Sequence, residues 1–241
     1  MLDALGRDYR IGWIEAIGTD ARYPVTEGWP HLVEQLIDEL ERARHDAPVY
    51  AVGHSLGGYL TLLAALRRPR LFRAVVLLDA PVIGALRGRM LGATKRLGIV
   101  DRVTPAGAVR DRRSHWQSRE QAKQHFRTRR LFRHFTDRCL DDYVRHGLIE
   151  RDGELHLLID PAIEYRIYRT IPHGMGRGLR GLEVPAGFIG GARSDVVRRA
   201  GLAATRAVCM TRQVPGGHLF PFEHPLEAAA AVHELLGELD G

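Results

Sequence analysis

The segment from residue 48 to residue 66 constrains the fold of this chain more than any other. It reads as a short apolar run, then Gly-His-Ser-Leu-Gly-Gly at 53–58, then a helix-like stretch. A serine between glycines at this spacing is typical of a sharp, strained turn from a strand into a helix. We expect that positions 53 and 57 must be glycine, Gly53 and Gly57, because a side chain at either one would keep the strand and the helix apart. The turn would hold the Ser55 hydroxyl above a sheet edge as a candidate nucleophile; the alternative is a glycine-rich turn without chemistry.

A nucleophilic serine needs partners, because its hydroxyl is a poor nucleophile at neutral pH. The interpretation therefore requires a histidine base and an acid that orients this base. The chain contains twelve histidines. His218 is the best placed of them, because it lies in a glycine-rich loop between the last predicted strand and the last predicted helix. His224 is its nearest competitor, and His54 is too close to Ser55 in sequence to point at the hydroxyl.

Two aspartates compete for the role of the acid. Asp195 lies in the loop that leaves a predicted buried strand, where it would accept the Nδ1 proton of the histidine. Its alternative role is to cap the N-terminus of a predicted helix at 196–206. Asp79 is the rival acid, because it ends the predicted strand 72–78, one strand beyond the nucleophile. The sequence favours Asp195 and leaves Asp79 open.

The order Ser55, Asp195, His218 is similar to that of the α/β-hydrolase superfamily, and the resemblance extends from about Tyr9 to the end of the chain. It implies an α/β fold in which a mainly parallel sheet carries helices on both faces. It also implies an esterase- or lipase-like Ser-His-Asp triad. The backbone N–H of Leu56 would then be one donor of the oxyanion hole.

The start of the chain departs from this resemblance. Residues 9–15 resemble a strand of the family, but the family places another strand before it, at the centre of the sheet, and the next loop supplies the second oxyanion donor. Residues 1–8 look like the tail of the helix that follows that strand. Without that strand, its two neighbours would have unpaired backbone groups, each of which costs about 1–3 kcal/mol if buried. We therefore expect that this sequence starts too far downstream or is a fragment of a longer protein. The alternative is a shortened chain whose sheet closes the gap or borrows a partner's strand.

Apolar residues recur at helical spacing over 27–44 and 226–239, and strands alternate with helices, which predicts a parallel sheet covered on both faces. Charged helical segments and aromatics interrupt this rhythm over 84–180. We therefore expect a hydrolase core at 1–83 and 181–241, with a helical cap, or lid, at 84–180 as the resemblance implies. Candidate pocket residues of the cap, for which simple packing is the alternative role, are Met90, Trp116, Phe126 and Tyr168.

Composition limits the partners. The chain of 241 residues is 45% hydrophobic, which is enough for one substantial core. Its net charge of +6 comes almost entirely from arginine and accompanies no nucleic-acid-binding motif, so we expect no nucleic-acid partner. The sequence shows neither a secretion signal nor a membrane-spanning run, and Cys139 and Cys209 fit reduced thiols, which favours a cytoplasmic protein. We expect no metal and no organic cofactor, and a homo-oligomer stays open.

These observations predict a serine hydrolase that cleaves a small or medium carboxylic ester or related acyl substrate. A serine at the turn argues against the dehalogenase and epoxide-hydrolase branches of the family, which use aspartate there. Lactonase, thioesterase, carbon–carbon hydrolase and cofactor-free haloperoxidase activities stay open, because one triad serves them all. The alternative from another class is a catalytically impaired or non-catalytic binding protein with the same fold.

Overall fold

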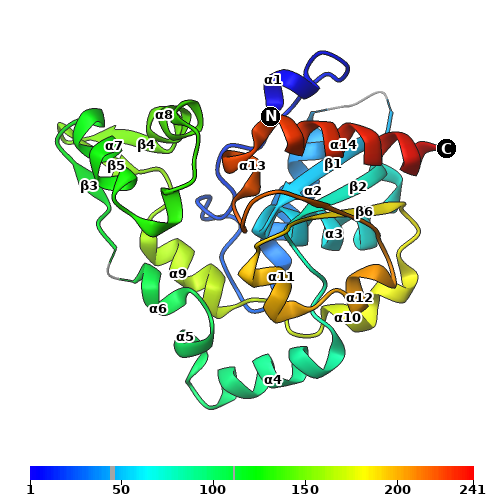
Figure 1. Cartoon of the computed structure of the whole chain (residues 1–241). Coiled ribbons are helices and arrows are strands. Elements are labelled where there is room, and N and C mark those ends of the chain that lie inside the picture. The colour runs from blue at the N-terminus through cyan, green and yellow to red at the C-terminus, as the bar shows by residue number, and fades with distance from the viewer. Residues whose placement is uncertain (44–46, 111) are drawn as a thin grey trace.

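The computed structural model describes residues 1–43, 47–110 and 112–241. Its central sheet has four parallel strands in the order β1-β2-β6-β7 (Figure 1). Their bounds are β1 Val49–His54, β2 Phe72–Leu78, β6 Ala186–Gly191 and β7 Met210–Val214. The mainly parallel sheet with helices on both faces was predicted and is confirmed.

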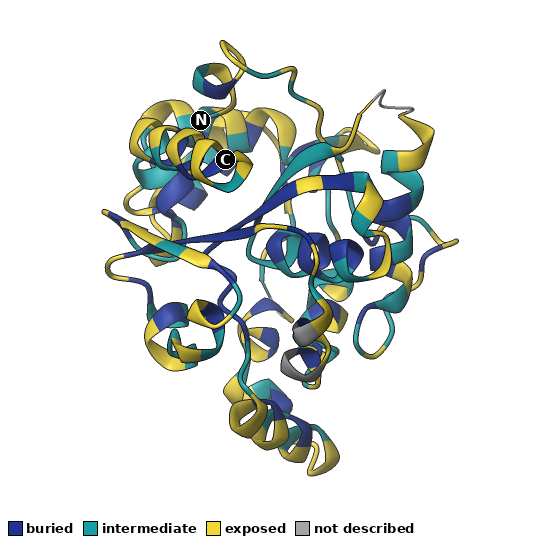
Figure 2. Ribbon diagram, turned by 90° about the vertical axis from the view of Figure 1, so that its right-hand side faces the viewer, coloured by how far each residue is buried: buried dark blue, intermediate teal, exposed yellow. Residues whose placement is uncertain are grey.

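Apart from the exposed Arg73 near the start of β2, the middle strands β2 and β6 are apolar because helices cover both of their faces. Val75 and Leu77 of β2 point to the face covered by helices α2 (Pro30–Arg42) and α3 (Leu56–Arg67). The alternate residues point to the opposite face, which helix α14 (Pro225–Asp240) covers. The buried positions of the sheet and these helices stand out in Figure 2.

Helix α14 packs unusually close to the sheet because β6 carries a glycine beneath it. A Cβ atom at Gly187 would lie only 2.5 Å from Leu235 Cδ2. Leu235 and Val232 are fully buried against this face. The predicted helix 226–239 is therefore confirmed within one residue at each end, with its apolar stripe on the sheet.

The N-terminal segment differs from its prediction. Helix α1 (Leu2–Leu5) is followed by residues 9–15 in irregular conformation rather than in a strand. The segment contacts the fold through side chains instead, since the Tyr9 ring meets the Tyr50 ring edge-on at 5.9 Å. A strand needs a neighbouring ladder, and among the described residues β1 pairs only with β2, which makes β1 an edge strand.

Residues 84–180 lie largely to one side of the sheet in Figure 1. A helical segment was expected there, but these residues are not purely helical. They include a small antiparallel sheet in the order β3-β5-β4. Its strands are only two to four residues long, too short for a periodicity signal. The elements of this insertion are α4 Ala85–Arg96, α5 Val100–Val103, α6 Ala106–Val109, β3 His115–Trp116, α7 Arg119–Arg127, α8 Asp137–His146, β4 Leu148–Arg151, β5 Glu154–Leu157, α9 Pro161–Arg169 and α10 Met175–Gly178.

After β6 the chain forms α11 (Asp195–Ala200) and α12 (Ala203–Arg206) where one helix was predicted. The break falls at Gly201, whose φ of 67° no residue within a right-handed helix adopts. A last short helix, α13 (Phe220–Glu223), precedes α14. The described part of the chain also has three 3₁₀ turns, η1 Pro69–Leu71, η2 Arg130–Phe132 and η3 Leu179–Gly181.

Candidate active site

Ser55 occupies a strained turn between β1 and α3, as the sequence predicted. Its φ of 50° and ψ of −114° lie outside the regions that side-chain-bearing residues favour, at a cost of about 1–3 kcal/mol. A Cβ atom at Gly53 would lie 2.3 Å from the carbonyl carbon of Gly57, so Gly53 must lack a side chain. Gly57 has open space around its own Cβ position, so that expectation for Gly57 was wrong.

The turn is tied to the end of the neighbouring strand. The Ser55 N–H donates to the carbonyl oxygen of Leu78 at 2.9 Å, and Leu78 is the last residue of β2. The next residue, Asp79, also has a positive φ, 49°. Strained backbone at Ser55 and Asp79 thus meets at one edge of the sheet, and strain of this kind is concentrated at functional sites.

His218 pairs with Asp79. Its Nδ1 lies 2.6 Å from Asp79 Oδ2, and the Asp79 side chain is fully buried. The other Asp79 oxygen accepts the Gly191 N–H at 2.8 Å, and Oδ2 also accepts the Ser194 hydroxyl at 2.5 Å. Three donors, two from the end of β6 and the turn after it and one from the loop after β7, therefore hold a carboxylate that would be costly to bury alone.

Asp195, the acid that the sequence favoured, does not contact His218. It is the first residue of α11, and its carboxylate pairs with Arg198 at 2.7 Å. The preceding residue, Ser194, turns inward instead: its hydroxyl accepts the Val197 N–H as the N-cap of α11 and donates to Asp79. Because Ser194 takes the inward position, the carboxylate one residue later points away from the site. Sequence reasoning missed Ser194, whose only signal is its place directly before a helix.

The loop that carries His218 is fixed on both sides of the histidine. Glu223 accepts the Gly217 N–H at 2.9 Å, and its side chain is only 8% exposed. The carbonyl oxygen of Gly216 accepts the Arg193 N–H at 2.8 Å. Gly216 itself needs to be glycine, because its φ is 108°. The competitor His224 lies at the start of α14, 3.7 Å from Glu227, and takes no part in this arrangement.

His54 contacts the backbone of the loop that carries His218. Its Nε2 lies 2.8 Å from the carbonyl oxygen of His218, and the two rings are 4.9 Å apart. A carbonyl oxygen only accepts, so the neutral ring donates its Nε2–H. Desolvation by burial, with the nearby His218 as the second cause, lowers the pKa of His54 from 6.5 to about 4. His54 therefore stays neutral at neutral pH and anchors the backbone of His218.

A sequence model described as the alpha/beta hydrolase family matches residues 3–232. The chain belongs to the alpha/beta hydrolase family. No curated protein sequence matches it significantly.

Several solved structures share the fold of this family member. The crystal structure of E-2-(acetamidomethylene)succinate hydrolase is 20% identical, with a TM-score of 0.69 over 89% of this chain and 76% of that chain. The thioesterase domain from the curacin biosynthetic pathway is 17% identical, with a TM-score of 0.65 over 89% and 74%. An esterase of M. tuberculosis is 21% identical, with a TM-score of 0.62 over 86% and 68%.

In this alpha/beta hydrolase family member, Leu56 begins helix α3 directly after Ser55. The first N–H groups of a helix have no partner within the helix and carry the positive end of its dipole. The Leu56 N–H is therefore suited to bind an oxygen that becomes negative beside Ser55.

The insertion reaches the histidine loop through aromatic packing. The Phe135 ring stacks on the Phe222 ring at 4.8 Å, and the Phe222 ring lies 6.4 Å from that of His54. The Thr136 N–H also donates to the Phe222 carbonyl oxygen at 3.1 Å. Residues 135–136 of the insertion thus pack beside the pair of histidines.

The candidate pocket residues that the sequence suggested lie in different environments. Trp116 and Phe126 are buried with each other in the separate core of the insertion. Met90 is 61% exposed on α4. Burial raises the pKa of Tyr168 to about 12, so its hydroxyl stays protonated. Within residues 1–43, 47–110 and 112–241, no group of three or more metal-ligating side chains is assembled.

None of the helices in the described part of the chain is both long and apolar enough to cross a membrane. The two cysteines lie apart, with Cys209 buried and Cys139 partly exposed, and each is a free thiol. Burial raises the pKa of Cys209 to about 12, which keeps that thiol protonated and unreactive.

Proposed function

We propose that this protein is a serine hydrolase that cleaves a small or medium carboxylic ester or a related acyl substrate, with Ser55, His218 and Asp79 as its triad. The observation that carries the proposal is the 2.6 Å contact between His218 Nδ1 and the buried Asp79. It lies at the sheet edge where Ser55 occupies its strained turn. Asp79 thereby replaces Asp195 as the proposed acid.

The reaction follows from the free atoms of these side chains. Because Nδ1 of His218 is engaged by Asp79, Nε2 is the nitrogen left to accept the Ser55 proton as Oγ attacks the carbonyl carbon. The Leu56 N–H would donate to the oxyanion of the tetrahedral intermediate. His218 then returns the proton to the leaving alcohol, and an acyl ester on Ser55 remains. Water, deprotonated by His218, hydrolyses this ester and restores the serine.

Asp79 orients and stabilises the imidazolium that forms in each step. It does so as a carboxylate held by the Gly191 N–H and the Ser194 hydroxyl, so it need not move when charge appears on His218. Preorganised charge of this kind costs no rearrangement at the moment of reaction.

Residues 84–180 would serve as the cap over the core formed by 1–83 and 181–241. The Phe135–Phe222 stack supports this division, because it brings the insertion against the histidine loop. The insertion also has a hydrophobic cluster of its own around Trp116. Acyl-chain selection would then depend on the insertion rather than on the sheet.

Hydrolysis of p-nitrophenyl esters of increasing acyl length tests the proposal. We expect turnover of short to medium esters by the wild type and none above background for Ser55→Ala. Ser114→Ala, a serine of the insertion, is the matched control and should keep wild-type kcat. Ester turnover that persists in Ser55→Ala after repurification would contradict the assignment of the nucleophile.

A further inference from the structure

Helix α4 exposes two of its large apolar side chains, which a helix of a folded core would bury. Leu86 and Met90 are 65% and 61% exposed, and Leu97, directly after the helix, is 72% exposed. The inner face carries glycines: a Cβ atom at Gly88 would lie 2.1 Å from the carbonyl oxygen of His173. The helix therefore packs by close backbone approach, and Leu86 and Met90 remain outside while Leu91 is half-buried.

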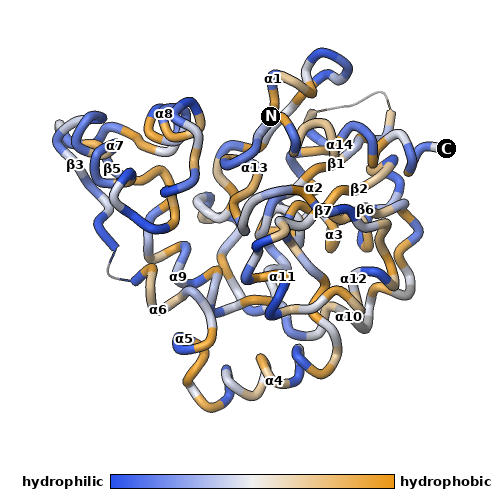
Figure 3. Tube along the Cα trace, viewed as in Figure 1, coloured by the Kyte–Doolittle hydropathy of each residue, from blue (hydrophilic) through white to orange (hydrophobic). Residues whose placement is uncertain are grey.

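Three of these side chains share one face of the helix, because positions 86, 90 and 97 follow helical spacing. After a break at Gly98, whose φ is 69°, the α5 region adds two exposed apolar residues, Ile99 and Val103, which are 36% and 53% exposed. We call Leu86, Met90, Leu97, Ile99 and Val103 the apolar ridge. Figure 1 shows α4 at the bottom of the molecule, away from the sheet, and Figure 3 shows apolar and charged residues alternating along it.

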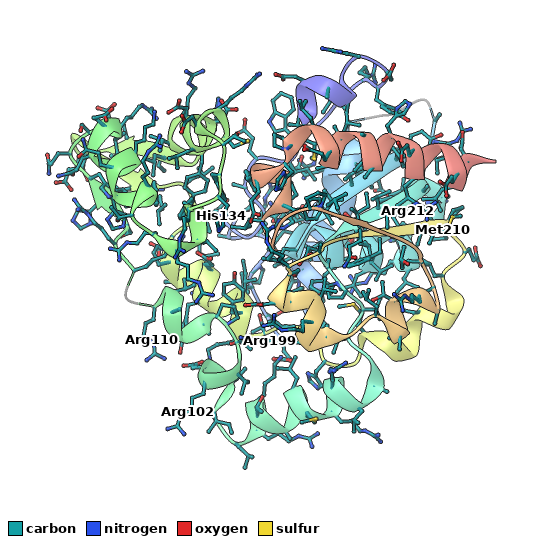
Figure 4. The ribbon with its side chains drawn as sticks, viewed as in Figure 1. Arg102, Arg110, His134, Arg199, Met210 and Arg212 are labelled. Carbon is teal, nitrogen blue, oxygen red and sulfur yellow. The ribbon has the colours of Figure 1, made fainter. Side chains whose placement is uncertain are left out.

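The surroundings of the ridge are mainly basic, although Asp101 lies between Ile99 and Val103 and pairs with Arg110 and Arg169. No acidic residue occurs from 80 to 100, whereas that stretch contains three arginines and a lysine. Lys95 pairs with Glu27 and Arg87 donates to a carbonyl of α11, but Arg89 and Arg96 are exposed beside the ridge. Arg102, exposed on α5, extends away from the molecule in Figure 4.

The exposed apolar and basic side chains together indicate which kind of partner binds the apolar ridge. A second copy would bring the same arginines face to face, and the ridge offers no aromatic ring on which a nucleic acid base could stack. On an anionic bilayer, exposed leucine and methionine side chains would contact the acyl boundary while the flanking arginines would meet the phosphates. We propose that the apolar ridge docks this protein on the surface of anionic lipid membranes, with Arg89, Arg96 and Arg102 facing the headgroup phosphates.

Co-sedimentation with vesicles tests the proposal. We expect the wild type to bind vesicles of phosphatidylcholine mixed with phosphatidylserine at least about tenfold more strongly than vesicles of phosphatidylcholine alone, and less strongly at high salt. L86S/M90S/L97S should lose most of this binding. R89Q/R96Q/R102Q should lose the preference for phosphatidylserine, because each arginine near such a surface contributes roughly fivefold.

Two matched controls change the same residue types elsewhere on the surface. L131S/M210S/L226S replaces two exposed leucines and a methionine, of which Met210 lies far from α4 in Figure 4. R70Q/R133Q/R145Q replaces three other exposed arginines. Both control variants should bind vesicles nearly as well as the wild type, and circular dichroism should show that all four variants keep the fold.

Several results would overturn the proposal. These are a wild type that stays in the supernatant, equal binding to both vesicle types, and ridge variants that bind as well as the controls. Concentration-dependent dimerisation without lipid, lost in L86S/M90S/L97S, would assign the ridge to a second copy instead. Ser55→Ala should bind vesicles like the wild type, because Ser55 is not part of the apolar ridge. None of the ridge substitutions touches the proposed triad, so this test stands or falls apart from the hydrolase proposal.

Discussion

At the scale of single residues, the contact of His218 with Asp79 favours Asp79 over Asp195 as the proposed acid. Asp79 and Asp195 both follow strands that end at the same sheet edge, which is why the sequence could narrow the acid to these two. The choice between them depends on which way one loop turns. The inward turn of Ser194 leaves Asp195 to pair with Arg198, and no periodicity or spacing encodes that rotation.

Replacing the acid should separate the two aspartates. Asp79→Asn should lower kcat by about 10⁴, the loss found for the equivalent change in a serine protease, because the amide stabilises the wrong histidine tautomer. Asp195→Asn should change kcat less than about threefold, since its half-exposed carboxylate pairs with the exposed Arg198. Steady-state kinetics of both variants on one ester measures the ranking. A larger loss for Asp195→Asn would return the acid to the loop after β6.

Ser194 should matter to stability beyond its helix cap. Ser194→Ala removes both the N-cap of α11 and a hydroxyl donor to a buried carboxylate, so the free energy of unfolding should fall by about 2–4 kcal/mol. Ser118 caps α7 through Gln121 but has no such buried partner. Ser118→Ala should therefore cost only about 1 kcal/mol. Urea unfolding compares the two, and equal losses would contradict the added role of Ser194.

His54 should make stability depend on pH. Its pKa in the folded state is lowered to about 4, so below pH 6.5 the unfolded chain binds a proton that the folded chain refuses. The stabilisation is fully present above pH 6.5 and is lost as the pH falls toward 4, by roughly 2–4 kcal/mol.

His54→Gln should flatten this dependence while the amide keeps a donor for the His218 carbonyl. His31→Gln, a change at an exposed histidine of α2, is the control and should leave the curve unchanged. Urea unfolding from pH 4 to pH 7 gives the comparison. Parallel curves for His54→Gln and the wild type would show that His54 is not the group responsible.

At the scale of elements, periodicity predicted most of the core and failed where an element depends on a neighbour. Strand β2 and helices α2 and α14 lie close to their predicted bounds, because their apolar patterns report burial directly. The pattern at 9–15 is strand-like too, yet a strand exists only through its partner, and that segment has none among the described residues. The short strands of the insertion carry too few residues to show a pattern.

The turn from β1 into α3 offers a test of element packing. Gly53→Ala should destabilise the protein by about 3 kcal/mol or more, because its Cβ would meet the backbone of Gly57 at 2.3 Å, where nothing can yield cheaply. Gly57→Ala meets open space and should be close to neutral. Thermal unfolding of the two variants measures the difference, and a neutral Gly53→Ala would mean that strand and helix do not meet this closely.

At the scale of the whole molecule, three hydrophobic clusters organise the chain. Two of them sandwich the parallel sheet, and the third lies within the insertion around Trp116 and Phe126. The break in the alternation of strands and helices over 84–180 predicts an insertion there. It did not show that the aromatics build a core of their own, because an aromatic that lines a pocket and one that fills a core read alike.

The central claim is that Ser55, activated by His218 and Asp79, is the covalent centre of a hydrolase. A fluorophosphonate probe followed by peptide mass spectrometry tests it most directly, since the probe forms a stable bond only with an activated serine. The account predicts one adduct per chain, located on Ser55, and slower labelling of Asp79→Asn. An adduct on another residue, or equal labelling of Ser55→Ala, would contradict it.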